Sequence, residues 1–341
     1  MINADKIETR SAGPDAWSVD SGDFPYGGSP REQARFLLKY AVLAPSVLNC
    51  QPWAFSVTRN EVRFFIDLAA WPEAVDPRQR DLHLSMGCAI ENFVIAARRF
   101  GFSPHVSYWP ERVNSLLVAA VELGRRSAGD TGSEADLFHA ITQRRTDHGW
   151  YSAEKICSCE LNALSAELNG SGAKLDFLTE PIRVLEVFNL VVRADAMMFS
   201  DPTYTNSLEY CMKQGIFGPQ WILRKLSELS TALITAETGG SPAHLMQDAS
   251  AIGVLSAVAD DRETWVKAGR LFERVFLRAN TLALSMEPST LPIQREETRE
   301  ALISLVGAAS SYPLVLFRLG YGSGGVPHTP RRSADALTMP V

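Results

Sequence analysis

The chain has 341 residues, 46% of them hydrophobic and 21% charged, a composition typical of a folded globular protein with a sizeable core. Its formal net charge of −6 argues against a general nucleic-acid binder, because neutralising phosphates requires a basic face. No segment approaches the ~20 apolar residues of a membrane span, and residues 1–29 lack the apolar core of a signal peptide. We therefore expect a cytoplasmic protein that does not enter a membrane.

The spacing of the cysteine and histidine residues matches neither a disulfide framework nor a metal site. The cysteines include no CxxC pair, so a disulfide framework is not expected and a reducing compartment is favoured. The histidines lack the spacing of a ligand set, so no metal site is predicted. The residues concerned are Cys50, Cys88, Cys157, Cys159, Cys211, His83, His105, His139, His148, His244 and His328.

In the first part of the chain, an arm over residues 1–30 is followed by alternating helix and strand signals. Apolar residues at helical spacing predict a helix over residues 31–44, which ends before Pro45. A longer helix with one apolar face is predicted from Asp81 to Phe100. Strands are predicted over residues 53–57, 62–68, 104–109 and 115–123.

The polar, Gly-rich residues 124–133 form the best domain boundary, between a first half over 31–125 and a second half over 134–341. Residues 200–243 are interrupted by Gly and Pro, and we interpret them as an irregular lid, with a peripheral pair of helices as the alternative. The order helix–loop–strand–helix–strand occurs twice, which indicates duplicated architecture. In the second half, helices are predicted over 134–143, 158–168, 182–199, 244–259 and 261–284, strands over 174–178 and 312–319, and a turn-rich segment over 286–292.

The first candidate site is the loop PSVLNCQPW, residues 45–53, in which small polar side chains stand between two prolines. Such a loop can hold its amides and carbonyls rigidly against the hydrogen-bonding edge of a flat heterocycle. The polar side chains available are Ser46, Asn49 and Gln51. The alternative is an ordinary helix-to-strand turn with Trp53 in the core, since turns favour these residues for local reasons.

Two arginine pairs form the other candidate sites. Arg144 and Arg145 precede Thr146, and Arg331 and Arg332 follow a proline near the end of the sequence. Guanidinium groups match phosphate oxygens in geometry, so the two pairs could converge on one phosphate. The alternative for each pair is a solvated surface position.

Four segments together resemble the nitroreductase superfamily. LAPSVLNCQPWAF is similar to the APS-x-x-N-x-QPW-x-F signature, and QRRTDHGWY is similar to the RRS-x-R-x-F/Y element that opens ordinary members. RDLHLSMGCAIENFVIAARRFG resembles the long central helix of the superfamily, and PHTPRRSADAL resembles its closing segment. The resemblance extends from residue 31 to residue 337.

The order of these segments bears on the architecture. In ordinary members RRS precedes APS within one subunit of a homodimer, whereas here APS begins at residue 44 and RRT follows at residue 144. Each half thus keeps one part of a composite site. The resemblance implies an α+β, nitroreductase-like fold in which two halves, each a mostly antiparallel sheet flanked by helices, form an intrachain pseudo-dimer. One complete FMN site is expected, as in the twin-type, Acg-like branch.

The resemblance also implies roles for individual residues. The flavin phosphate would be bound by Arg144, Arg145, Arg331 and Arg332, with Thr146 where the family commonly has Ser. The isoalloxazine or ribityl group would be contacted by Pro45, Ser46, Val47, Asn49 and Gln51. Backbone near flavin N5 would come from Glu287, Pro288 and Ser289, and His148 replaces an arginine often found in the opening element.

The function implied is an FMN-dependent oxidoreductase that takes hydride from NAD(P)H and passes it, in ping-pong fashion, to a nitroaromatic, quinone or related small acceptor. No catalytic side chain is required, because the flavin carries the chemistry. One alternative is a protein that binds or sequesters FMN in an occluded site, and another is a scaffold without cofactor. The expected assembly is a monomer with pseudo-dimeric architecture, or a homodimer of it.

Overall fold

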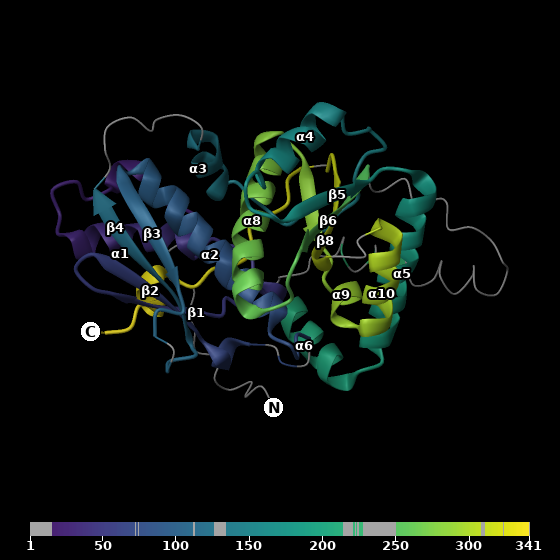
Figure 1. Ribbon diagram of the computed structural model, residues 1–341, viewed down its shortest axis with the longest axis horizontal. Coiled ribbons are helices and arrows are strands. Elements are labelled where there is room, and N and C mark those ends of the chain that lie inside the picture. Colours follow the sequence, from purple (N-terminus) through teal and green to yellow (C-terminus); the bar gives the residue numbers. More distant parts are fainter. Residues whose placement is uncertain are drawn as a thin grey trace.

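The chain is described by a computed structural model over residues 16–71, 73, 75–111, 113–125, 134–213, 221, 223, 225–227, 250–307, 311–322 and 324–340. Figure 1 shows two halves side by side, each with its own sheet, and two long helices where they meet. Buried side chains from both halves form one continuous core, which includes Phe93 on the first side and Phe276 on the second.

The two sheets have the same topology. Each has four antiparallel strands, and in each the second strand in sequence pairs with the first and the fourth, while the third lies at an edge. The first sheet, ordered β1-β2-β4-β3, contains β1 (Trp53–Val57), β2 (Glu61–Ile66), β3 (Phe102–Tyr108) and β4 (Leu117–Arg125). The second, ordered β5-β6-β8-β7, contains β5 (Lys174–Leu178), β6 (Ala251–Ala257), β7 (Ser285–Pro288) and β8 (Tyr312–Gly320). The predicted fold class is thereby confirmed.

Two equivalent helices form the junction between the halves. Helix α2 (Arg80–Arg99) connects β2 to β3, and helix α8 (Arg262–Thr281) connects β6 to β7. They cross with their backbones in contact at Gly87 and Gly269: a Cβ added to Gly87 would lie 2.1 Å from Val266 O. One added to Gly269 would lie 2.0 Å from Leu84 O. Only glycine permits this approach at either position.

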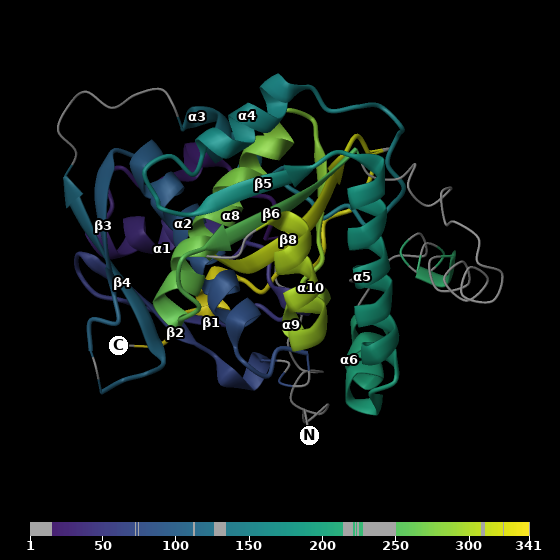
Figure 2. The same cartoon turned by 45° about the vertical axis from the view of Figure 1, so that its right-hand side comes forward.

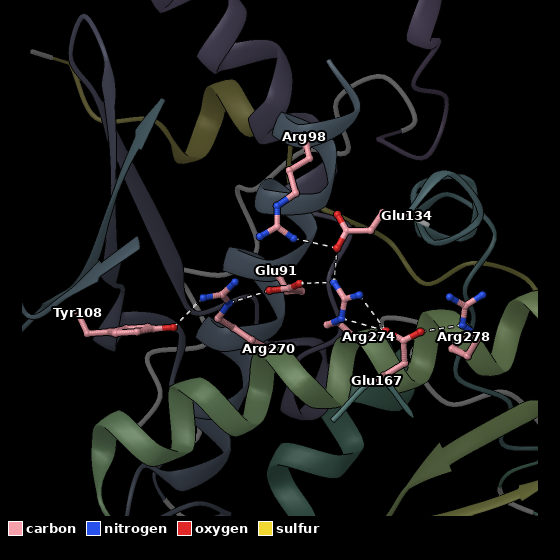
Figure 3. A network of polar contacts seen from close by, with 8 residues as sticks. All are labelled: Glu91, Arg98, Tyr108, Glu134, Glu167, Arg270, Arg274 and Arg278. Atoms are coloured by element: carbon pink, nitrogen blue, oxygen red, sulfur yellow. Dashed lines mark hydrogen bonds and ion pairs between the residues drawn. The ribbon is translucent and has the colours of Figure 1, made fainter. Parts of the chain in front are cut away.

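A buried network of charges borders the same junction (Figure 3). Glu91 on α2 accepts from Arg270 Nε at 2.7 Å and from Arg274 Nη1 at 3.1 Å, both on α8. Arg274 also reaches Glu134 at 2.7 Å and Glu167 at 2.9 Å. Although burial opposes it, the positive charges of the two arginines lower the pKa of Glu91. The carboxylate is therefore held charged between the halves.

The remaining helices surround these layers. Helix α1 starts with Pro30 after a capping box formed by Ser29 and Glu32, which satisfies the exposed amides of its first turn. Figure 2 shows α5 and α6 running one after the other along one side of the second sheet. The helices are α1 (Pro30–Ala41), α3 (Ala135–Ile141), α4 (Ser158–Ala166), α5 (Pro181–Phe199), α6 (Pro202–Lys213), α9 (Leu291–Gln294), α10 (Glu296–Val306) and α11 (Ala334–Leu337).

The C-terminal segment leaves the second sheet and packs on the first half, where Figure 1 draws it in yellow beside β1 and α1. Met339 N donates to Phe55 O at 2.8 Å, and Thr338 forms an isolated parallel bridge with Phe55. The segment from β8 to α11 therefore brings residues 329–332 from the second half to the first.

Several predicted elements differ from the structure. The helix predicted over residues 244–259 is wrong, because Ala251–Ala257 form β6, buried along its whole length, where an apolar run without alternation is ambiguous. The turn-rich segment contains β7 and α9, and residues 202–213 of the irregular lid form α6. Residues 214–220, 222, 224 and 228–249, which hold the rest of the predicted lid, lie outside the described residues, as do residues 1–15 of the arm and 126–133 of the boundary.

One disulfide joins Cys157 and Cys159 at the start of α4, although the sequence had predicted no disulfide framework. The turn into the helix brings the two Cα atoms to 5.3 Å, which is within the range that a disulfide spans. Among the described residues, no helix combines the length and apolar character needed to cross a bilayer.

Candidate functional site

The loop that follows α1 has an unusual backbone. Leu48, Asn49 and Gln51 have φ values of 48°, 52° and 49°, in the left-handed region that non-glycine residues rarely adopt. Ser46 holds the loop in this form, because its carbonyl accepts from Asn49 N at 2.9 Å and its hydroxyl accepts from Gln51 N at 2.9 Å. Clusters of strained residues of this kind are characteristic of binding loops.

The C-terminal segment is hydrogen-bonded to this loop. Asn49 Nδ2 donates to Pro330 O at 2.9 Å, and its Oδ1 accepts from Arg331 Nη1 at 2.6 Å. Gln51 Oε1 accepts from Arg332 N at 2.7 Å. The side chains of Asn49 and Gln51 thus connect the loop of the first half to the segment that arrives from the second.

Two arginines from distant parts of the sequence lie beside the loop, of which Arg144 is buried and Arg331 is half-buried. Arg144 is 1% exposed, and it donates to Leu43 O at 2.9 Å while its Nε lies 3.6 Å from Glu273 Oε1. Burial lowers the pKa of Arg331, and the nearby positive charge of Arg144 lowers it further. Burial also raises the pKa of Glu273 to about 7, with Arg144 opposing the shift. Two guanidinium groups therefore share one carboxylate that is itself hard to ionise.

A cavity of 270 Å³ opens between the loop and the second half. One wall comes from the loop and from Leu84, Ser85 and Cys88 on α2. A second, apolar part of the lining comes from one face of α5, whose residues recur at helical spacing. The residues that line the cavity include Val184, Val187, Phe188, Val191, Pro288, Ser289, Thr290, Val315, Phe317 and Arg331.

A chain of three polar side chains lies in the cavity wall. His148 Nδ1 is 2.7 Å from Glu287 Oε1, and Glu287 Oε2 accepts from Arg318 Nε at 2.5 Å. All three residues line the cavity. Glu287 is on β7 and Arg318 is its register partner on β8, so the pairing of the two strands fixes the middle of this chain.

The predicted site residues fall into two groups. Those that line the cavity are Pro45, Ser46, Val47, Asn49, Thr146, Pro288, Ser289 and Arg331. Among the others, Gln51 is buried against the C-terminal segment, Arg144 is buried beside Glu273, Arg145 is exposed, and Arg332 pairs with Asp67 at 3.4 Å. Their contacts with a cofactor stay a prediction.

Sequence reasoning missed Asp81, which lines the cavity from the first turn of α2 and is 4% exposed. Burial raises its pKa. Burial and the charge of Asp81 also raise the pKa of the adjacent Asp76 to about 7. The only signal available was two acidic residues on either side of a helix start, which capping explains equally well. Arg318 was missed too, although a single charge within the apolar run YPLVLFRL needs a buried partner.

Within the part of the chain that the structure describes, no group of three or more His, Cys, Asp or Glu side chains is arranged to hold a metal ion. The polar groups that line the cavity instead include Arg331, which is hydrogen-bonded to the loop through Asn49, and the hydrogen-bonded chain of His148, Glu287 and Arg318. Such a site suits an elongated organic ligand that has an anionic group at one end.

Comparison with known proteins agrees with this architecture. No protein-family model matches the chain. Over 319 residues it is 26% identical to the Mycobacterium tuberculosis protein named "Putative NAD(P)H nitroreductase Rv3131", an alignment that covers 90% of this chain and 91% of that relative. A second relative from the same organism, "Putative NAD(P)H nitroreductase acg", is 23% identical over 316 residues, covering 88% and 93%.

Solved structures with some likeness include a nitroreductase with bound FMN from Bacteroides fragilis, which is 14% identical with a TM-score of 0.37 over 56% of this chain and 90% of that one. Another, from Desulfitobacterium hafniense, is 12% identical with a TM-score of 0.37 over 57% and 92%. The resemblance to the nitroreductase superfamily is confirmed by the full-length relatives. Over nearly its whole length the chain is similar to proteins named as putative NAD(P)H nitroreductases, and its two sheets of the same topology fit a twin arrangement of two such halves.

Proposed function

We propose that this chain binds FMN in the cavity between its halves and acts as an NAD(P)H-dependent oxidoreductase. The observation that carries the proposal is the meeting of the strained loop 45–51 with two arginines, Arg331, which lines the cavity, and Arg144, which is buried against Leu43 and Glu273. The loop belongs to the first half and Arg144 to the second. The relatives that align over the full length carry nitroreductase names, in keeping with this assignment.

The residues present fit a flavin mononucleotide. Arg144 Nε and Arg331 Nε are buried and donate no hydrogen bond within the described structure, although Arg144 Nε lies near Glu273. A phosphate dianion in the cavity would accept from Arg331 and would offset the repulsion between Arg331 and the buried Arg144, since guanidinium groups are the usual partners of phosphate in proteins. The loop edge formed by Ser46, Val47 and Asn49 would face the flat ring system.

FMN, when bound, would supply the hydride chemistry between NAD(P)H and an oxidised acceptor. The protein would bind and orient both partners in turn at one site, as a ping-pong mechanism requires. The apolar face of α5, with Val184, Val187 and Val191, favours flat acceptors of low polarity such as nitroaromatics or quinones.

A second candidate function is sequestration of FMN in an occluded site. It is favoured by the buried ion pair between Asp195 Oδ2 and Lys225 Nζ, at 2.5 Å, where both residues line the cavity. Tyr204 and Trp221, which are 5% and 7% exposed, line the same side. A wall closed in this way would exclude a large acceptor or a nicotinamide.

The test is the absorbance spectrum of the purified protein with FMN, recorded before and after anaerobic addition of NADPH or NADH. Prompt bleaching supports the reductase, and a flavin spectrum that stays oxidised supports sequestration. Failure to bind FMN would contradict both proposals.

A variant of Arg331 tests the phosphate end of the site. Losing a charge-assisted contact costs about 1.5–3 kcal/mol, so we expect Arg331→Ala to weaken FMN binding by about 10- to 100-fold. The FMN affinity of Arg331→Lys should lie between those of Arg331→Ala and the unmodified protein, because lysine keeps the positive charge but lacks the paired N–H donors of a guanidinium. The exposed Arg31 on α1 provides the control, and Arg31→Ala should bind FMN as the unmodified protein does. Equal affinities for the Arg331 and Arg31 variants, measured by fluorescence titration, would place the phosphate elsewhere.

A further inference from the structure

The polar chain of His148, Glu287 and Arg318 is not explained by cofactor binding. Its members are largely buried, with side-chain exposures of 21%, 8% and 11%. They line the cavity from β7, from β8 and from the segment after α3, and no residue of the loop is among their hydrogen-bond partners described above. A carboxylate and a guanidinium are costly to bury, so their presence beside an apolar wall calls for a use.

Arg318 is fixed on several sides. Its guanidinium carbon lies 3.8 Å from the centroid of the Tyr151 ring, and its Nη2 donates to Gly149 O. Its Nε donates to Glu287, and the strand pairing of β7 with β8 sets the distance between the two backbones. Arg318 thus places a positive charge beside the Glu287 carboxylate and holds it in one orientation.

Glu287 in turn orients His148. With Glu287 Oε1 at 2.7 Å, the Nδ1 atom of His148 carries the proton of this hydrogen bond, since a carboxylate can only accept. Proton exchange with a ligand in the cavity therefore uses Nε2. The backbone that precedes His148 is fixed as well. Thr146 forms an isolated β-bridge with Met286, and Asp147 N donates to Met286 O at 3.2 Å. An imidazole oriented by a carboxylate is the arrangement of a general acid or base.

We propose that His148 is the proton donor to the acceptor that is reduced in this cavity, and that Glu287 and Arg318 position it. The inference rests on the proposed function. A quinone becomes a hydroquinone by gaining one hydride and one proton. NAD(P)H is the source of the hydride, and the Nε2–H of the His148 imidazolium gives its proton to the quinone oxygen. Water then returns a proton to Nε2.

Histidine suits this step because an imidazolium can donate a proton and the imidazole that remains can take one back. Several other groups could add ionisations to the same pH profile. Asp147 lies beside His148, where it accepts from Gly149 N at 2.9 Å and from Ser285 Oγ at 2.9 Å. The other titratable or charged side chains lining the cavity are Asp81 and Cys88 on α2, Asp195 on α5, Tyr204 on α6, Lys225 and Arg331.

The experiment compares His148→Gln with His105→Gln, whose histidine is exposed on β3. For each protein loaded with FMN, stopped flow measures bleaching by NADPH and then, separately, reoxidation by 1,4-benzoquinone from pH 5 to pH 9. We expect His148→Gln to bleach at the unmodified rate. Its reoxidation should be about 100-fold slower at neutral pH, the usual scale of a lost general acid, and should lose one ionisation from its profile. His105→Gln should match the unmodified protein in both steps.

Two further variants make the result specific. His148→Ala should recover reoxidation when imidazole is added, which a purely structural role would not produce. Asp81→Asn should leave the ionisation assigned to His148 in place. NMR provides a readout that does not depend on turnover. The ring signal of His148 is identified as the histidine signal that is missing in His148→Gln. We expect 4-nitrobenzoate bound in the cavity to shift this signal.

The outcomes separate the two proposals. If the unmodified protein neither binds FMN nor bleaches, the proposed function fails. If bleaching is normal and His148→Gln reoxidises at the unmodified rate with an unchanged pH profile, only the role of His148 is overturned. A His148→Gln protein that loses FMN would assign His148 to cofactor binding and would also overturn the proposal.

Discussion

His83 lies on α2 with 1% of its surface exposed, and its Nδ1 is 2.5 Å from Gln79 O. Burial lowers its pKa to about 4, below the 6.5 of an ordinary histidine. The folded state therefore keeps His83 neutral at a pH where the unfolded chain binds a proton, so stability is lost as pH falls from about 6.5 towards 4. Asp76, whose pKa is raised to about 7, acts with the opposite sign, because its contribution is lost as pH rises from about 4 to 7.

Comparing the pH dependence of stability in His83→Gln and in the unmodified protein isolates the contribution of this histidine. Between pH 7 and pH 5 we expect His83 to lower the free energy of unfolding by about 2 kcal/mol. In His83→Gln this contribution disappears, although the variant is less stable at every pH because its environment is tightly packed. Urea unfolding at pH 7 and pH 5 gives the change in the free energy of unfolding for each of the two proteins. The same pH dependence in the variant and the unmodified protein would show that His83 is not the residue responsible.

At the scale of elements, the crossing of α2 and α8 depends on two glycines that lack room for a side chain. We expect Gly87→Ala to lower the free energy of unfolding by about 3 kcal/mol or more, because the new Cβ would displace the backbone of α8. Gly27→Ala is the control, since nothing lies within 4 Å of a Cβ at that position and its φ is ordinary. Thermal unfolding measures both, and equal melting temperatures would contradict the contact.

How far the sequence predicted these elements depended on the strength of the local pattern. The long α2, with its continuous apolar face, and the strands ending in hairpins were predicted correctly, because their periodicity is set by neighbours in sequence. Strand β6 was predicted as a helix, because its pairing partners β5 and β8 are distant in sequence and its apolar run fits either form. The short β7 is defined only by pairing with β8.

The candidate site likewise combines residues that a local sequence pattern indicates with residues that only the folded structure brings together. The loop 45–51 was found because its residue types are unusual in combination, and Arg331 because it follows a proline in a paired motif. The polar chain from His148 to Arg318 depends on the register of β7 against β8, which no local pattern encodes. The buried state of Arg144, beside an exposed Arg145, likewise follows from packing against Phe276 and Glu273.

At the scale of the whole molecule, the halves are joined by the charges around Glu91 (Figure 3). Removing one partner of a buried ion network leaves the others uncompensated and costs about 3–5 kcal/mol. We expect Glu91→Ala to lose stability on that scale, since the half-buried Arg270 and Arg274 would remain without their buried partner.

Glu263 gives a matched comparison, because it pairs with Lys267 on the exposed side of α8 at 2.6 Å. Such surface pairs contribute less than about 1 kcal/mol, so Glu263→Ala should be nearly neutral. Chemical unfolding of both variants tests the difference. Comparable losses in the two would mean that the network does not join the halves.

The crossing of the C-terminal segment onto the first half has a consequence for how the site responds to dilution. When a site is shared between separate subunits, dilution separates them and the ligand is released. Here both contributors are parts of one polypeptide, so their effective concentration is fixed by the chain and not by the solution. Ligand affinity should therefore stay constant down to nanomolar protein, where many shared-site dimers have already dissociated.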